Sequence, residues 1–300
     1  MWILLLALLF VLTTSRSVEK DVKIDEPVLF SADPEESMEL LKKGRVNVSN
    51  LIYGGTKARP GQFPQHAFVM FKDASEGYYS VCGGTLISRT HVLTAAHCSW
   101  GSSIAGSRIM VGGLNNQEHS GSDQWRNVRR IVHHPGYRPR RIGDDIAVVE
   151  FSPAVTLNRN TKLARIATDD SKLLRIRKSY VTGYGTVTWE PQPRSSQVLL
   201  WSEITLFSPS ECRQKLEGAM NNKQICAGAK NKGAGQGDSG GPIQVLSNKQ
   251  LWQVGLTSFG GTTSHYDDEH NQDRFPTVFT RVSSYCDFLS KSTNGAFRCQ

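Results

Sequence analysis

Apolar and polar positions divide the chain into three parts. Residues 1–11 are almost wholly apolar, residues 18–50 are polar and charged, and short apolar runs separated by turn residues follow from Ile52 onward. These later runs are rich in valine, isoleucine, leucine, threonine and aromatic residues, a composition typical of strands. We expect strands over 67–71, 91–94, 109–111, 146–151, 198–206, 242–246 and 251–257. So many short strands without helices between them predict an all-β fold, either an antiparallel sandwich or a barrel.

A few helices are also expected. One should follow the cap-like sequence Ser208-Pro209-Ser210-Glu211, because serine at a helix start accepts hydrogen bonds from exposed backbone amides. A second should run from about Val282 to Leu289 near the end of the chain. A third, short helix is expected within 31–41.

The first segment has the pattern of a secretory signal peptide. Its apolar run of about ten residues is too short to cross a hydrocarbon core of roughly 30 Å as a helix, which disfavours a membrane anchor. Small residues at Thr13, Ser15 and Ser17 follow the run, so we expect cleavage after Ser15 or Ser17 and assign residues 1–17 to the signal peptide. Because no other long apolar run follows, we expect a soluble extracellular protein without a membrane span.

Charge is distributed unevenly along the remaining chain. Residues 18–51 carry a net charge of −3, whereas residues 52–300 carry +10, with arginines clustered at 126–130, 138–141 and 175–177. A nucleic-acid partner is disfavoured because the chain is exported and lacks a repeat of basic and aromatic residues. The basic surface is either simply solvated or a surface that holds anionic glycans.

Six cysteines in an exported chain are expected to pair, although six allow 15 different connectivities. The sequence Asn47-Val48-Ser49 is an acceptor site for N-glycosylation at Asn47.

Three segments carry candidate chemistry. Gly237-Asp238-Ser239-Gly240-Gly241-Pro242 places a serine in a glycine-rich turn. A serine is a weak nucleophile until a base and a third, orienting group act on it. His97, within Thr94-Ala95-Ala96-His97-Cys98, can be the base, and Asp145, at the start of an apolar run, can be the orienting carboxylate. The order His, Asp, Ser is one of the chain orders known for this catalytic geometry.

With these segments, the chain resembles the trypsin/chymotrypsin family over about residues 52–291. Further motifs of that family are Ile52-Tyr53-Gly54-Gly55, Ser258-Phe259-Gly260 and the run from Pro276 to Val282. The resemblance implies a trypsin-like fold: two antiparallel six-stranded Greek-key barrels, a catalytic cleft between them and a C-terminal helix. It implies a monomeric serine endopeptidase, whose substrates are proteins or peptides and which needs no cofactor or metal.

The resemblance also implies roles for individual residues. Ser239 would attack the substrate carbonyl, His97 would take its proton, and Asp145 would orient His97. The amides of Gly237 and Ser239 would form the oxyanion hole, and Ser258, Phe259 and Gly260 would bind the substrate backbone. A calcium site of some relatives is not expected, because Gly113 stands where a ligand would be needed.

The family also implies disulfides. It pairs Cys82 with Cys98 and Cys212 with Cys226, which leaves Cys286 and Cys299 to pair with each other.

Activation follows from the family as well. Residues 18–51 would be a propeptide, removed by an activating protease, and the new amino group of Ile52 would pair with Asp238. The residue before Ile52 is Leu51, and the nearest basic residue upstream is Arg45. The cut therefore falls after Leu51 or proceeds stepwise from Arg45.

Specificity departs from trypsin. Gly233 stands six residues before Ser239, where an acidic pocket base would be expected, and Thr277 stands where glycine is common. We expect cleavage after small to medium apolar residues, with Gly260 leaving the pocket mouth open. The acidic loop 261–275 is expected to be solvated; the alternative is that it reaches in and favours a basic residue at or near the cleavage site. The competing hypothesis is a catalytically silent binding protein that uses the basic surface.

Overall fold

The structure is a computed structural model that describes residues 28–30, 52, 54–75, 78–117, 121–141, 143–188, 194–218, 220–260 and 270–300. The signal peptide, Arg45, Asn47, Leu51 and the acidic residues of 261–269 lie outside the described residues. The expectations that concern them stay predictions.

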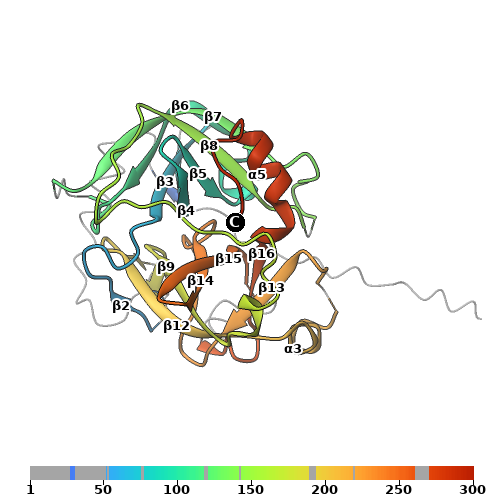
Figure 1. Cartoon of the computed structure of the whole chain (residues 1–300). Coiled ribbons are helices and arrows are strands. Elements are labelled where there is room, and N and C mark those ends of the chain that lie inside the picture. Colours follow the sequence, from blue (N-terminus) through green and yellow to red (C-terminus); the bar gives the residue numbers. More distant parts are fainter. Residues whose placement is uncertain are drawn as a thin grey trace, which may run out of the picture.

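Six antiparallel strands of the first half close into a barrel, drawn in blue to green in Figure 1. The strand order is β4-β3-β6-β7-β8-β5, and a further pairing of β4 with β5 closes the sheet on itself. Alternate side chains point inward along each strand and fill the barrel with residues such as Val69, Phe71, Leu86 and Phe151. The strands are β3 (His66–Asp73), β4 (Tyr79–Ser88), β5 (His91–Thr94), β6 (Ser102–Val111), β7 (Gln124–His133) and β8 (Ala147–Ser152).

The second half repeats this arrangement. The order is β13-β16-β15-β14-β9-β12, closed by pairing of β13 with β12, and β2 (Thr56–Lys57) adds to the edge of β12. Ile52 is fully buried in the core of this barrel, in one cluster with Val181, Leu200 and Phe279. The strands are β9 (Lys178–Gly183), β12 (Leu200–Leu206), β13 (Gln224–Gly228), β14 (Pro242–Ser247), β15 (Gln250–Phe259) and β16 (Thr277–Arg281); β10 (Thr186–Thr188) and β11 (Arg194–Ser195) form a separate two-stranded ribbon.

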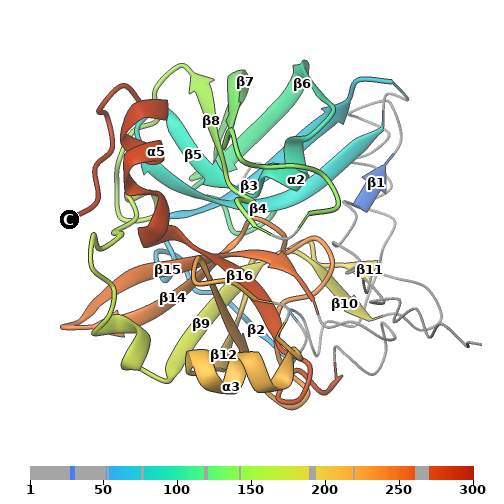
Figure 2. The same cartoon turned by 90° about the vertical axis from the view of Figure 1, so that its right-hand side faces the viewer.

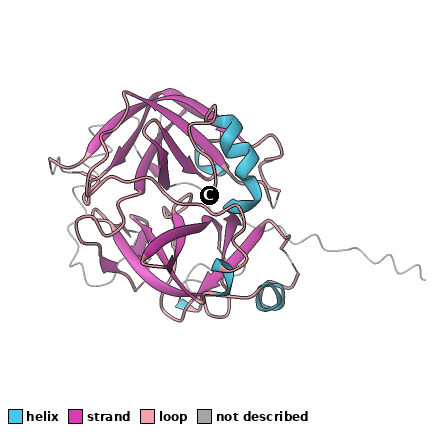
Figure 3. Ribbon diagram, viewed as in Figure 1, coloured by secondary structure: helices cyan, strands magenta, loops and turns pink. Residues whose placement is uncertain are grey.

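Helices are few and short, as Figure 3 shows. α3 (Pro209–Lys215) begins with a capping box in which Ser208 and Glu211 satisfy each other's backbone amides. A short 3-10 turn, η1 (Leu173–Arg175), precedes β9. Near the end of the chain a second 3-10 turn, η2 (Val282–Tyr285), leads directly into α5 (Cys286–Ser292). Leu289 of α5 lies in one buried cluster with Leu93 and Val148 of the first barrel and with Leu256 of the second, so the last segment of the chain packs against both halves.

The expected architecture of two six-stranded barrels and a C-terminal helix is confirmed. Each predicted strand overlaps an observed one, and the run 91–94 coincides with β5. The capped helix after Ser208 is confirmed, while the last helix begins as a 3-10 turn and extends three residues beyond Leu289. Within the part of the chain that the structure describes, no helix has the length and apolar character needed to cross a membrane.

The three disulfides also agree with the expected pairing: Cys82 with Cys98, Cys212 with Cys226, and Cys286 with Cys299.

One segment upstream of Ile52 is described as well. β1 (Val28–Phe30) pairs antiparallel with the beginning of β4, with Val28 opposite Val81 and Phe30 opposite Tyr79. Figure 2 shows β1 beside the first barrel, close to that end of β4.

Candidate active site

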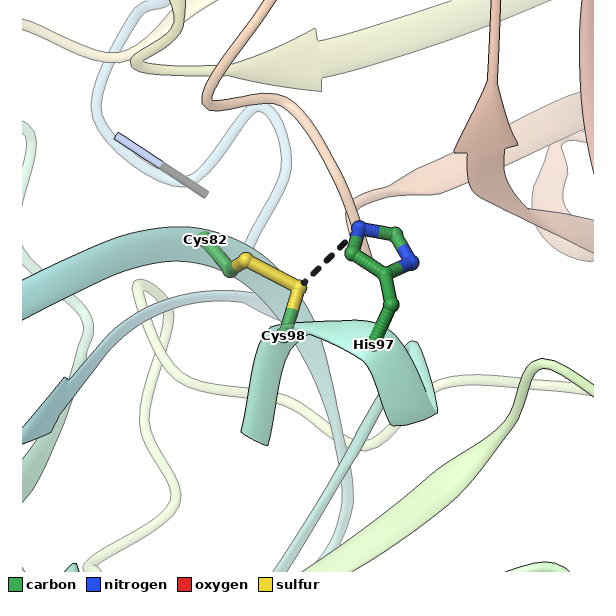
Figure 4. A group of neighbouring side chains, drawn as sticks. All are labelled: Cys82, His97 and Cys98. Atoms are coloured by element: carbon green, nitrogen blue, oxygen red, sulfur yellow. Dashed lines mark hydrogen bonds between the residues drawn. A yellow bond between two sulfur atoms is a disulfide. The ribbon is translucent and has the colours of Figure 1, made fainter. Parts of the chain in front are cut away.

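His97 lies in α2 (Ala96–Ser99), a single helical turn that follows directly after β5. The next residue, Cys98, is tied to Cys82 on β4 by a disulfide, which anchors this turn to the first barrel (Figure 4). Sγ of Cys98 lies 3.8 Å from Nε2 of His97. Although these three residues form a cluster of metal-ligating types, both sulfurs are committed to the disulfide and cannot bind a metal as thiolates.

Asp145 joins His97 through two hydrogen bonds. Its Oδ1 accepts from the backbone amide of His97 at 2.9 Å, and its Oδ2 lies 2.8 Å from the ring Nδ1. Because an ionised carboxylate only accepts hydrogen bonds, Nδ1 must carry the proton and Nε2 is left as the basic nitrogen. This arrangement leaves Nε2 of His97 able to accept a proton.

Two further residues hold Asp145 from the second barrel. Ser258 Oγ donates to Asp145 Oδ2 at 2.5 Å, and Thr280 Oγ1 donates to the backbone carbonyl of Asp145 at 2.9 Å. Burial alone would raise the pKa of the Asp145 carboxyl, but the charge of His97 and the hydrogen bonds from His97 and Ser258 outweigh it. The net pKa lies below its usual value, so Asp145 is ionised at neutral pH.

Ser239 lies in a turn wedged between the two barrels. Its carbonyl accepts a hydrogen bond from Gly83 of β4 at 2.8 Å, and the next amide, of Gly240, donates to Thr257 of β15 at 2.8 Å. A Cβ on Gly240 would lie 2.1 Å from Thr94 Oγ1, and its φ of +72° disfavours other residues, so only glycine fits there. The turn is thus seated against Thr94, three residues before His97, which brings Ser239 and His97 to the same junction.

Asp238 is buried at 1% exposure and is held by glycine backbone. Its Oδ1 accepts from the amide of Gly185 at 2.8 Å and its Oδ2 from the amide of Gly235 at 2.9 Å. A Cβ on Gly183 would lie 1.9 Å from Oδ1, so the seat of this carboxylate depends on the absence of a side chain there. Ile52 is buried in the core of the same barrel.

The expected specificity residues gather at the end of β15. Ser258 and Phe259 are buried, Gly260 follows β15, and Phe259 pairs with Val278, the neighbour of Thr277 on β16. Oγ1 of Thr277 donates to Oε1 of Gln272 at 3.0 Å, and the amide of Gln272 abuts Gly233.

The sequence does not predict the burial of Gln272. It predicts a solvated loop over 261–275, yet Gln272 is only 3% exposed. No signal in the sequence singles out this residue, because a glutamine among charged loop residues is typical of an exposed turn.

Comparison with known proteins agrees with this geometry. A model of the Trypsin family matches residues 52–289. Chymotrypsin-like elastase family member 1 of the rat, Rattus norvegicus, is 33% identical over 244 residues, which cover 80% of this chain and 88% of that protein. Cathepsin G of the mouse, Mus musculus, is 31% identical over 243 residues, which cover 80% of this chain and 85% of the relative. The two barrels and the site at their junction are those of a serine endopeptidase. The chain belongs to the trypsin family.

Proposed function

We propose that Ser239, His97 and Asp145 are the catalytic triad of a secreted endopeptidase that is made as an inactive precursor. The observation that carries this proposal is the doubly hydrogen-bonded pair of His97 and Asp145 beside the turn that holds Ser239. Ser239 Oγ attacks the scissile carbonyl while Nε2 of His97 accepts its proton, and a tetrahedral intermediate forms. His97 donates this proton to the nitrogen of the leaving amine as the C–N bond breaks, which leaves an acyl-enzyme. Water then releases the acyl group, with His97 again acting first as base and then as acid.

Groups held in fixed positions stabilise the charges that develop during these steps. Asp145, ionised and buried, stabilises the imidazolium form of His97. The amides of Gly237 and Ser239 receive the oxyanion, and each such donor lowers the barrier by about 3 kcal/mol. Gly237 adopts a φ of +92°, a conformation that glycine reaches without strain and that turns the backbone at this point. No metal or organic cofactor is required for these steps.

The same proposal includes an inactive precursor. Cleavage by an activating protease would free the amino group of Ile52 to pair with Asp238, whose carboxylate the amides of Gly185 and Gly235 already bind. β1 gives independent support, because it pairs with β4 two residues before Gly83, the residue that binds the carbonyl of Ser239. A segment upstream of Ile52 therefore pairs with the strand that also binds the turn of Ser239.

Substrates, location and modification complete the proposal. Residues 1–17 direct export and are then removed; the enzyme acts outside the cell as a monomer and carries a glycan on Asn47 of the propeptide. It cleaves proteins or peptides after small to medium apolar residues, and its basic surface binds anionic glycans.

Labelling with a fluorophosphonate tests whether the protein is an enzyme. The reagent reacts only with a serine activated by its neighbours, so the activated protein should be labelled at Ser239 and the variant Ser239→Ala should not. Replacing the buried Ser202 by alanine is a matched control that should leave labelling unchanged. Absence of labelling in a correctly folded, cleaved protein would support the silent binding protein instead.

A further inference from the structure

The side chain of Gln272 fills the space directly in front of Gly233. A Cβ on Gly233 would lie 1.7 Å from Gln272 Oε1, 2.2 Å from Cδ and 2.6 Å from Nε2. These distances are far below van der Waals contact, so the amide occupies the space that any side chain at position 233 would need. Gly233 and Gln272 are therefore complementary in shape: the missing side chain of Gly233 leaves the space that the Gln272 amide fills.

Hydrogen bonds hold the Gln272 amide in one orientation. Nε2 donates to the carbonyl of Ala234 at 2.7 Å, and Oε1 accepts from Oγ1 of Thr277 at 3.0 Å. With the amide turned over, an oxygen would face the Ala234 carbonyl and repel it. The backbone is equally constrained, because a Cβ on Gly228 would lie 2.1 Å from the Gln272 carbonyl oxygen. A buried amide that is satisfied on both atoms costs little to keep and is unfavourable to displace.

We propose that Gln272 forms the floor of the primary specificity pocket and restricts the residue before the scissile bond to small, uncharged side chains. This inference rests on the proposed function and narrows the range of residues expected before the scissile bond. The amide spans from Gly233 on one side to Thr277 on the other, and so shortens the pocket from within. Alanine and valine fit above such a floor, whereas phenylalanine has to displace the amide.

The floor also decides the charge that the pocket accepts. The Gln272 amide is neutral, and the donor Thr277 and the acceptor Ala234 are already used by it. A lysine or arginine side chain would be buried there without a negative partner, which is unfavourable. The variant Gln272→Glu changes this with almost no change in shape. One carboxylate oxygen still accepts from Thr277, but the other faces the Ala234 carbonyl and becomes stable only beside a cation.

Substrate profiling of variants tests the inference. The full chain, with a recognition sequence for a processing protease placed before Ile52, is cleaved and then titrated with a fluorophosphonate. Equal amounts of active enzyme are compared on peptides that differ only in the residue before the scissile bond. Gln272→Ala should raise kcat/KM for phenylalanine relative to alanine by about tenfold or more, and Gln272→Glu should do the same for lysine relative to leucine.

Gln250→Glu is the matched control, because Gln250 is exposed at the start of β15 and the charge change is the same. It should leave the profile unchanged. If the enzymes react with the fluorophosphonate but all of them share one profile, Gln272 is not the pocket floor. If neither wild type nor variants react, the proposed function itself is refuted, and the inference with it.

A measurement of stability checks the packing without any turnover. Gly233→Ala should lower the thermal unfolding midpoint of the wild type because of the clash with Gln272. In the Gln272→Ala background the same substitution should have a much smaller effect. Equal shifts of the unfolding midpoint in both backgrounds would contradict the proposed contact. The comparison of the two shifts still tests this contact when one variant is only marginally stable.

Discussion

Asp145 binds His97 twice, through the backbone amide and through the ring nitrogen Nδ1, so the carboxylate fixes both the main chain and the side chain of this residue. Because of the bond to the backbone, the orientation of His97 relative to Asp145 does not depend on the side-chain rotamer of His97 alone. An isosteric amide at position 145 can keep a geometry like that of the carboxylate while reversing the direction of one hydrogen bond. Such a substitution therefore separates the effect of position from the effect of where the imidazole proton lies.

Asp145→Asn should therefore leave the fold intact and abolish most of the activity. The amide NH₂ of asparagine can turn toward Nδ1 and favour the tautomer in which Nε2 carries the proton, so His97 can no longer accept the proton of Ser239. We expect kcat to fall by about four orders of magnitude, with little change in the unfolding midpoint.

Asp144→Asn is the matched control for that experiment. Asp144 is the neighbouring residue, but its carboxylate contacts Lys223 and Tyr285 instead of His97. Its kcat should stay within about threefold of wild type. An equal loss of kcat in the two variants would show that general electrostatics, and not the tautomer of His97, is responsible.

Much of this site could be predicted from the sequence, because its residues occur in local motifs whose backbone conformation is encoded nearby. The turn that holds Ser239 carries its own glycines, and the three cysteine pairs follow the family pattern. Gln272 could not be predicted, since its burial depends on a space left by Gly233, 39 positions earlier in the chain. β7 is equally hard to recognise, because only Val128 among its ten residues is buried and the apolar pattern is weak.

His66 should make the junction between the barrels sensitive to acid. It lies on β3, its Nδ1 is 2.9 Å from Oγ1 of Thr182 on β9, and within the described structure its Nε2 has no hydrogen-bond partner. Burial lowers the pKa of His66 to about 3 from a usual value of 6.5. Above pH 6.5 the residue is neutral in both states, but below it the unfolded chain takes up a proton that the folded chain does not.

Stability should therefore fall as the pH drops from about 6.5 toward 3, with His66 contributing up to about 1.4 kcal/mol for each pH unit. Urea unfolding at pH 7.5, 6 and 5 measures this slope. His66→Gln removes the titrating group, keeps a polar side chain near Thr182, and should give a shallower decline. Parallel slopes for the two proteins would rule out His66 as the cause.

The disulfide between Cys286 and Cys299 should contribute stability and not activity. It joins two cysteines that lie 13 positions apart and ties α5 to the chain end, where the Gln300 amide donates to the carbonyl of Ile166. Replacing both cysteines by serine should lower the free energy of unfolding by about 3 kcal/mol, because the unfolded chain gains loop entropy. Specific activity at 25 °C, corrected by active-site titration, should remain close to wild type. A large loss of activity per titrated site would mean that this tail also shapes the cleft.

The basic surface should bind heparin in a salt-dependent way. Arg138, Arg140 and Arg141 are exposed and follow one another closely after β7, within a region of net charge +10. Exposed charges are screened beyond roughly 8 Å at physiological ionic strength, so retention on a heparin column should weaken steeply with salt. Replacing the three arginines by alanine should lower the eluting salt concentration, whereas Lys230→Ala, a single exposed change elsewhere, should have a smaller effect. Flow-through of the wild type at low salt would reject glycan binding.

Activation should depend on a new charge beside the nucleophile. The carboxylate of Asp238 is buried and hydrogen-bonded by two neutral amides, and an ion of this kind is stabilised strongly by a buried countercharge. The α-amino group of Ile52 can supply this charge only after the bond from Leu51 is cut. We therefore expect the chain 18–300 to be nearly inactive and a chain that begins at Ile52 to be active. Asp238→Asn should lose most of this activity even when cleaved.

Pairing with a carboxylate raises the pKa of an amine above its unperturbed value of about 7.7–8.0, so activity should persist at neutral pH and fade as alkaline pH removes the proton. N-terminal sequencing of the active species, together with a turnover assay across pH 7–11, checks each step. Full activity in a chain that starts at Val46, with Leu51–Ile52 intact, would overturn this account of the switch.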